Sequence, residues 1–189
     1  IVVADTLAVY VDNVYGNISG YSGFAFVLAT FFFTIQIYCD FSGYSNIAIG
    51  SAKLFGVNLM TNFASPYFSK SIKEFWSRWH ISLSTWFKDY VYIPLGGNRC
   101  SKLRNSFNLI VTFLVSGIWH GADWTYVIWG GIHGIAQVLE KAADGPLKKL
   151  KSKKTGVFIS WLFVFMFCNF AWVFFRASSL HDALYVIGE

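Results

Sequence analysis

The sequence of 189 residues has little charge. Only 13% of its residues are Asp, Glu, Lys or Arg, whereas 55% are hydrophobic and 20% are aromatic. A soluble domain normally carries about 25% charged residues, most of them on its surface. Half that fraction is too small for a surface that faces only water, so we expect the lipid bilayer to contact much of the chain.

Cysteine is also scarce. Cys39, Cys100 and Cys168 lie far apart, and no CxxC pair occurs. Isolated cysteines in odd number argue against a disulfide framework and a zinc site, so we expect no bound metal. The net charge of +5 does not indicate nucleic-acid binding, because Lys and Arg interrupt apolar runs instead of forming one stripe. The chain begins at Ile1 without a signal-peptide pattern, and we interpret it as an internal piece of a longer protein.

Long apolar stretches predict an all-α protein, a polytopic bundle of transmembrane helices. We expect membrane helices at residues 23–39, 44–60, 105–119, 124–139 and 157–175. The second stretch is the weakest, because it contains Lys53, but its small residues suit a helix that packs against other helices. The third and fourth form an apolar hairpin with a very short connection. Gln36 and Asn169 interrupt two of the stretches, and we favour contacts between helices over residues of a substrate pathway for both.

Residues 70–95 have a different pattern. From Ile72 to Tyr90, aromatic and aliphatic residues recur at helical spacing, and basic or polar residues occupy the other positions. We expect an amphipathic helix that lies in the membrane interface or re-enters between other helices, with a soluble core helix as the alternative. Pro94 and the glycines at 96 and 97 end this segment in a loop.

Basic residues flank the hairpin on both sides. They are Arg99, Lys102 and Arg104 before it, and Lys141, Lys148, Lys149, Lys151, Lys153 and Lys154 after it. Short basic loops remain cytoplasmic, so the connecting turn at residues 119–124 (WHGADW) points outward. The first arm, residues 105–119, is about 22 Å long, whereas the hydrocarbon core is about 30 Å thick. His120 is therefore expected within the depth of the membrane, in a turn that needs a cavity around it.

The four histidines differ in their expected roles. A neutral imidazole accepts a proton near physiological pH, which makes His120 the candidate catalytic base, with a hydrogen-bonded structural histidine as the alternative. His80 lies at the edge of the amphipathic pattern, where it either lines a cavity or faces lipid headgroups. We interpret His133 as a packing or hydrogen-bonding residue and His181 as either structural or without a role. Asp40 follows the first apolar stretch and either caps the next helix or pairs with a base.

Three runs of sequence together resemble the membrane-bound O-acyltransferase (MBOAT) family. They are DFSGYSNIAIG (residues 40–50), FWSRWHISLSTWFKDYVYIPLGGNR (75–99) and SGIWHGADWTYVIWGGIHG (116–134). The similarity is greatest to the bacterial branch that acetylates alginate or transfers D-alanine to teichoic acid, and FFRASS (174–179) fits that branch too. The resemblance covers most of residues 36–180, and the order and spacing of the runs make it specific.

The resemblance implies a multi-helix bundle pierced by a tunnel. It also implies that His120, in WHG, is the essential histidine and that His80, in RWH, lines the tunnel. Relatives often carry an acidic residue where this chain has Asn46, and full-length members have several more helices before this region. The candidate substrate contacts are Trp119, Trp124, Asp40 and Arg78.

The expected function is acyl transfer across a bacterial inner membrane by a multi-pass protein. An acyl group, acetyl above all, would pass from a cytoplasmic thioester (acetyl-CoA or an acyl carrier protein) to a hydroxyl of an extracytoplasmic polysaccharide. Arg78, Lys88 and Arg99 would attract the anionic donor, although membrane topology explains them equally well. We expect no tightly bound cofactor, and an extracytoplasmic transferase is a possible partner. The alternatives are a transporter or channel, and a non-catalytic scaffold for a separate transferase.

Overall fold

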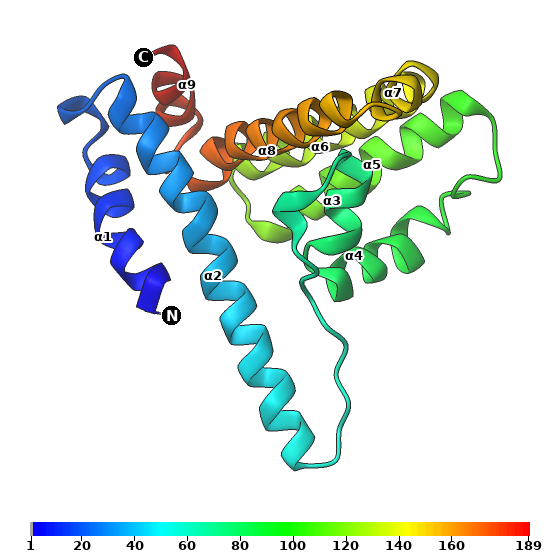
Figure 1. Cartoon of the computed structure of the whole chain (residues 1–189), viewed down its shortest axis with the longest axis horizontal. Coiled ribbons are helices and arrows are strands. Elements are labelled where there is room, and N and C mark those ends of the chain that lie inside the picture. Colours follow the sequence, from blue (N-terminus) through cyan, green and yellow to red (C-terminus); the bar gives the residue numbers. More distant parts are fainter. Residues whose placement is uncertain (1) are drawn as a thin grey trace. The chain divides into compact units, whose positions relative to one another are not determined.

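The computed structural model describes residues 2–189, which are 79% helical and contain no strand (Figure 1). This confirms the all-α class. The chain forms two compact units. Unit 1 comprises residues 1–62 and 168–189, and unit 2 comprises residues 63–167.

Unit 1 consists of helices that bury apolar side chains and share a few polar contacts. Its elements are α1 (Val2–Gly16), η1 (Ile18–Gly20), α2 (Phe24–Leu54), the last part of α8 (Lys154–Arg176), and α9 (Leu180–Gly188). The Tyr15 hydroxyl lies 2.8 Å from Thr30 Oγ1, which ties α1 to α2. The Thr34 hydroxyl donates to Asn169 Oδ1 at 2.8 Å, confirming that Asn169 serves as a contact between helices.

The two helices expected at residues 23–39 and 44–60 are one continuous helix, α2. No proline interrupts this stretch, and single small residues do not stop a helix. The helix ends where Gly56 adopts a φ of +74°. There the N–H of Val57 donates to the carbonyl of Ala52, which closes the helix with a glycine cap. Residues 57–60, predicted to be helical, lie beyond this cap.

The hairpin of α5 (Lys102–His120) and α6 (Trp124–Ala142) is the most closely packed part of unit 2. The two helices approach closely because their contact contains glycine. A Cβ atom on Gly117 would lie 2.3 Å from the carbonyl oxygen of Tyr126. One on Gly130 would lie 2.3 Å from that of Phe113. The expected hairpin is confirmed, with longer arms than predicted and only residues 121–123 between them.

Shorter elements complete unit 2. They are η2 (Pro66–Phe68), α3 (Ile72–Arg78), α4 (Ile81–Phe87), the π-helical turn η3 (Lys88–Tyr92), α7 (Asp144–Lys151) and the first part of α8. The single amphipathic helix expected within residues 70–95 is wrong, because the chain turns sharply between α3 and α4. Trp79 is extended there, and His80 adopts the left-handed conformation with φ 43° and ψ 58°. The prediction that His80 lies at the edge of the apolar face of one continuous helix is therefore wrong too.

Two helices within the described residues are long and apolar enough to cross a membrane, α2 and α8. The arms of the hairpin do not meet the same hydropathy criterion in this part of the chain. Polar residues lower the hydropathy of both arms. They include Asn105, Asn108 and Ser116 in α5 and His133 in α6, all of them buried. That the arms span the membrane stays a prediction.

Candidate functional site

His120 is the last residue of α5, at the tip of the hairpin. Its half-buried imidazole packs between two indoles. The ring of Trp119 lies 5.0 Å away between centroids, at 81°. The ring of Trp129, on α6, lies 5.1 Å away at 88°. Asp123 caps the start of α6 by accepting the N–H of Thr125, which fixes the tight return of the chain beside His120.

His80 lies near His120 in unit 2, and the two imidazoles are close enough to interact electrostatically. The carbonyl of His80 accepts the N–H of Ser84, so the strained residue begins α4. Burial lowers the pKa of the His80 imidazole to about 4, so this ring is neutral at physiological pH. Left-handed backbone at a non-glycine residue is uncommon and clusters at functional sites. The structure thus brings together the two histidines expected to be catalytic.

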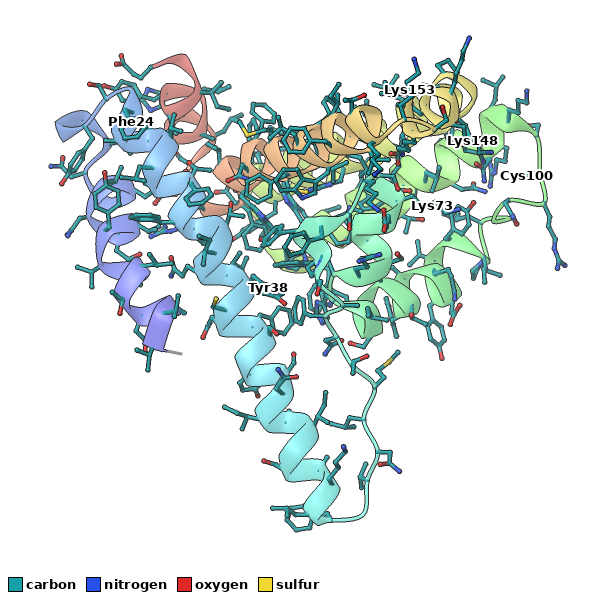
Figure 2. The ribbon with its side chains drawn as sticks, in the orientation of Figure 1. Phe24, Tyr38, Lys73, Cys100, Lys148 and Lys153 are labelled. Atoms are coloured by element: carbon teal, nitrogen blue, oxygen red, sulfur yellow. The ribbon has the colours of Figure 1, made fainter. Side chains whose placement is uncertain are left out.

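A cavity of about 1050 Å³ lies against the hairpin within unit 2. Its apolar wall includes Trp76, Leu83, Phe87, Leu109 and Phe113. Five lysines also line it, namely Lys73, Lys88, Lys141, Lys148 and Lys151. Figure 2 labels Lys73 and Lys148, which come from α3 and α7. The lining includes Ser84 and Ser116, each four residues from a histidine of the site, His80 and His120 respectively.

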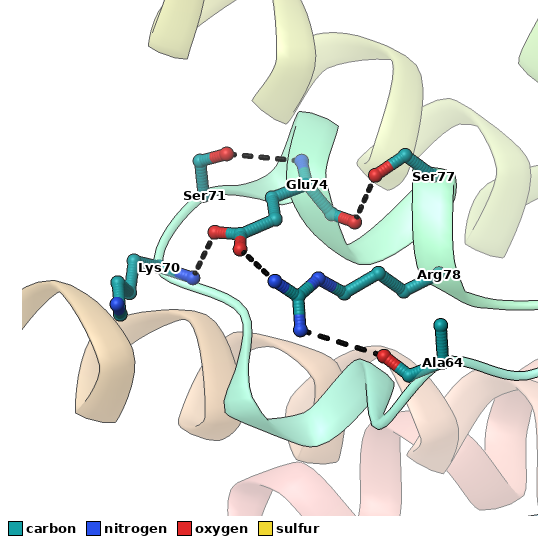
Figure 3. Close-up of polar contacts among 6 residues, drawn as sticks. All are labelled: Ala64, Lys70, Ser71, Glu74, Ser77 and Arg78. Carbon is teal, nitrogen blue, oxygen red and sulfur yellow. Dashed lines mark hydrogen bonds and ion pairs between the residues drawn. The ribbon is translucent and has the colours of Figure 1, made fainter.

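Arg78 has partners within its own unit (Figure 3). Its guanidinium forms a 2.7 Å ion pair with Glu74 and lies 3.4 Å from the carbonyl of Ala64. Glu74 also accepts the N–H of Lys70 at 2.8 Å. Ser71 caps α3 by accepting the N–H of Glu74 at 2.9 Å. These contacts hold the start of unit 2 against α3, and binding of substrate by Arg78 stays a prediction.

The other three predicted substrate contacts differ in their exposure and in the unit to which they belong. Trp119 touches His120, although 57% of its surface is exposed. Trp124 begins α6 and is 70% exposed. Asp40 lies exposed in the middle of α2, so its interpretation as the cap of a second helix is wrong. It belongs to unit 1, whereas both histidines belong to unit 2.

Trp129 and Trp76 contribute to the site and were missed by sequence reasoning. Trp129 is 1% exposed and packs against both His120 and His133. The spacing of four residues between Trp129 and His133 places them on one face of α6 and was the available signal. The indole N–H of Trp76 donates to Nδ1 of His133 at 3.2 Å, confirming a hydrogen-bonding role for His133. His181, by contrast, is exposed and lies 3.5 Å from Asp182.

No group of three or more metal-ligating side chains occurs among the described residues. The cysteines are free thiols in this part of the chain, two of them half-buried and Cys168 buried.

Comparisons with known proteins cover almost the whole chain. A family model described as "MBOAT, membrane-bound O-acyltransferase family" matches residues 4–180. The chain is 43% identical over 187 residues to a peptidoglycan O-acetyltransferase of Helicobacter pylori, covering 99% of this chain and 35% of that protein. It is 44% identical over 186 residues to a probable alginate O-acetylase AlgI of Pseudomonas putida, covering 98% and 37%. A teichoic acid D-alanyltransferase of Bacillus subtilis is 30% identical over 159 residues, covering 79% and 40%. The chain thus spans about a third of the length of the first two relatives.

Proposed function

The chain belongs to the membrane-bound O-acyltransferase family, and on that premise we propose that it forms the catalytic part of an enzyme that acylates a cell-surface polysaccharide. The observation that carries this proposal is the proximity of His80 to His120 at the tip of the hairpin, where the two imidazoles are close enough to interact electrostatically. The left-handed turn at His80 and the tight turn after His120 come from segments 40 residues apart in sequence, and their imidazoles interact electrostatically, which supports a shared role.

In the proposed reaction His120 is the general base. Its neutral imidazole removes the proton of the acceptor hydroxyl as that oxygen bonds to the thioester carbonyl carbon. The tetrahedral intermediate then collapses, the C–S bond breaks, and the imidazolium returns the proton to the leaving thiolate. The products are an ester and a free thiol. A transient acyl-histidine is the second route. His80 either hydrogen-bonds the developing oxyanion or positions the donor.

The lysine-lined cavity is the proposed approach of the acyl donor. The lining contains five lysines but only two carboxylates, those of Glu140 and Asp144. Its net charge is therefore positive, and it attracts an anion. The donor would be acetyl-CoA or an acyl carrier protein, both of which carry a thioester on a phosphorylated arm. Phosphate would meet the lysines, and the apolar arm would follow the aromatic wall toward Ser84 and Ser116. Among the bases first expected to attract the donor, Lys88 lines this cavity.

The proposed setting is a multi-pass protein of a bacterial inner membrane. Two apolar helices, α2 and α8, support membrane insertion, and the rest of the longer protein would complete the bundle. Relatives named for alginate, peptidoglycan and teichoic acid support a polysaccharide or teichoic-acid acceptor on the outer side. A separate extracytoplasmic transferase would be a partner if acyl transfer to the polymer is completed outside the membrane.

The test is a full-length protein with His120→Ala, compared with His181→Ala as the exposed control. Membranes receive radiolabelled acetyl donor, and the ester on surface polymer is counted per inserted protein. We expect the His120 variant to lose at least about 100-fold and the His181 variant to match the wild type. Activity that persists in His120→Ala refutes the proposal. A labelled donor that crosses the membrane without any ester being formed would instead identify a transporter.

A further inference from the structure

α6 presents two hydrogen-bond acceptors to α3 along one face. His133 and Glu140 are seven residues apart, which returns to the same side of a helix after two turns. His133 Nδ1 accepts the indole N–H of Trp76. The Glu140 carboxylate accepts the backbone N–H groups of Ile72 at 3.1 Å and Lys73 at 3.0 Å. The first contact fixes a side chain of α3, and the second fixes the start of its backbone.

The contact between His133 and Trp76 specifies the chemical state of the imidazole. An indole nitrogen can only donate, so Nδ1 of His133 must carry no proton. The ring is then the neutral tautomer protonated at Nε2. His133 is 1% exposed and is surrounded by other aromatic rings. Phe75, Phe113 and Phe167 lie at 6.4, 6.2 and 5.2 Å between ring centroids. A buried imidazole surrounded by aromatic rings packs as another aromatic ring. It also provides one hydrogen-bond acceptor, Nδ1, to Trp76.

One indole separates His133 from the histidine at the hairpin tip. Trp129 lies 5.2 Å from His133 at 72° and 5.1 Å from His120 at 88°. Trp76 packs edge to face on Trp129 at 5.7 Å and also lines the cavity. The Trp76 indole therefore touches both the cavity space and the ring that supports His120. Its orientation depends on the hydrogen bond that His133 accepts.

We propose that His133 is a positioning residue for acyl transfer, whose Nδ1 acceptor holds Trp76 and, through Trp129, the imidazole of His120. This inference rests on the proposed function. It separates two contributions of His133, since the aromatic volume supports folding whereas the acceptor atom sets the geometry of the site. Loss of the acceptor lets the Trp76 indole rotate, which moves a cavity wall and loosens the support of His120.

The test compares His133→Asn with His133→Phe in the full-length protein. Asn places its carbonyl oxygen at the same number of bonds from Cβ as Nδ1, so it keeps the acceptor but loses ring volume. Phe keeps the ring but has no acceptor. We expect the Phe variant to lose kcat by about 10- to 100-fold per folded protein, the size of effect that follows from misplaced catalytic groups. The Asn variant should be less stable yet recover most of that kcat.

Trp76→Phe gives an independent measurement, because it removes the donor and keeps an aromatic wall. Its loss of kcat should match that of His133→Phe, and the double variant should lose no more than either single variant, since both remove one interaction. A Phe variant at 133 as active as wild type, or more active than the Asn variant, overturns the proposal. So does additive loss in the double variant. These results leave the His120→Ala test unaffected, so failure of this inference is distinct from failure of the proposed function.

Discussion

The carboxylate of Glu140, near the end of α6, accepts the backbone N–H of Ile72, the first residue of α3, at 3.1 Å. Its second oxygen accepts the N–H of Lys73. A helix leaves its first amides without partners inside the helix, and a carboxylate there also complements the positive end of the helix dipole. Glu140 therefore caps α3 from 68 residues away and fixes it on the hairpin.

Replacing Glu140 should lower stability in proportion to the acceptors lost. Glu140→Ala leaves two amides without their carboxylate and should cost about 2 kcal/mol, whereas Glu140→Gln keeps one acceptor and should cost about 1 kcal/mol. Denaturant unfolding of the full-length protein in detergent measures both. Asp144→Ala is the control, because its partner Lys148 and Asp144 itself are mostly exposed and such pairs contribute little. Equal effects at 140 and 144 would contradict the capping role.

The hairpin and its histidine were predictable from local pattern. Apolar arms on both sides of WHGADW, with basic residues at their far ends, indicate two helices and a tight turn, and the structure has them. His120 follows from that pattern, because it is the histidine at the turn, whereas the other ionisable residue there, Asp123, caps α6. At the opposite end of the hairpin Lys141 donates to the side-chain oxygen of Asn105, which ties the two arms together there.

The break at His80 was not predictable, because no proline or glycine marks it. It follows from tertiary packing of Trp79, whose ring lies 5.0 Å from Phe63 and 5.6 Å from Phe75. Burying that indole favours an extended residue followed by a left-handed one over a continuous helix. Trp129 was overlooked for a related reason. In sequence it is one of many tryptophans, and only the close approach of α5 and α6 at Gly130 places it against His120.

The close approach of the hairpin arms should make two glycines intolerant of a methyl group. Gly117→Ala and Gly130→Ala each place a carbon 2.3 Å from a backbone oxygen on the facing helix, which cannot move aside as a side chain can. We expect each to cost about 3 kcal/mol and to lower the yield of folded protein. Gly131→Ala is the matched control. Its added carbon meets only a Leu114 methyl at 3.6 Å, and alanine favours helix, so stability should hold or rise by up to about 1 kcal/mol.

Substitutions at His80 should distinguish the effect of its left-handed backbone on stability from the effect of its imidazole on activity. Glycine adopts the left-handed region freely, so His80→Gly should be about 1 kcal/mol more stable than His80→Ala. At Thr85, within α4, Thr85→Ala should instead be more stable than Thr85→Gly, because alanine is the better helix former. Acyl-transfer assays on the same variants report on the ring, and both His80 variants should lose activity. If alanine is the more stable residue at both positions, the left-handed turn does not form.

Charge in the cavity should control the affinity for the acyl donor. Lys73 and Lys148 line the cavity from different helices, whereas Lys153, also labelled in Figure 2, is absent from its lining among the described residues. Lys73→Gln with Lys148→Gln should raise the KM for the donor by about 10-fold at low salt and leave kcat within about 2-fold, because the lysines attract phosphate without touching the reacting carbonyl. The difference from wild type should shrink as salt screens these charges. Lys153→Gln removes a charge of the same sign nearby, so a general effect of surface potential would change its KM as well. A donor KM that is unchanged in the double variant, or that rises equally in the Lys153 variant, would show that the donor does not use this cavity.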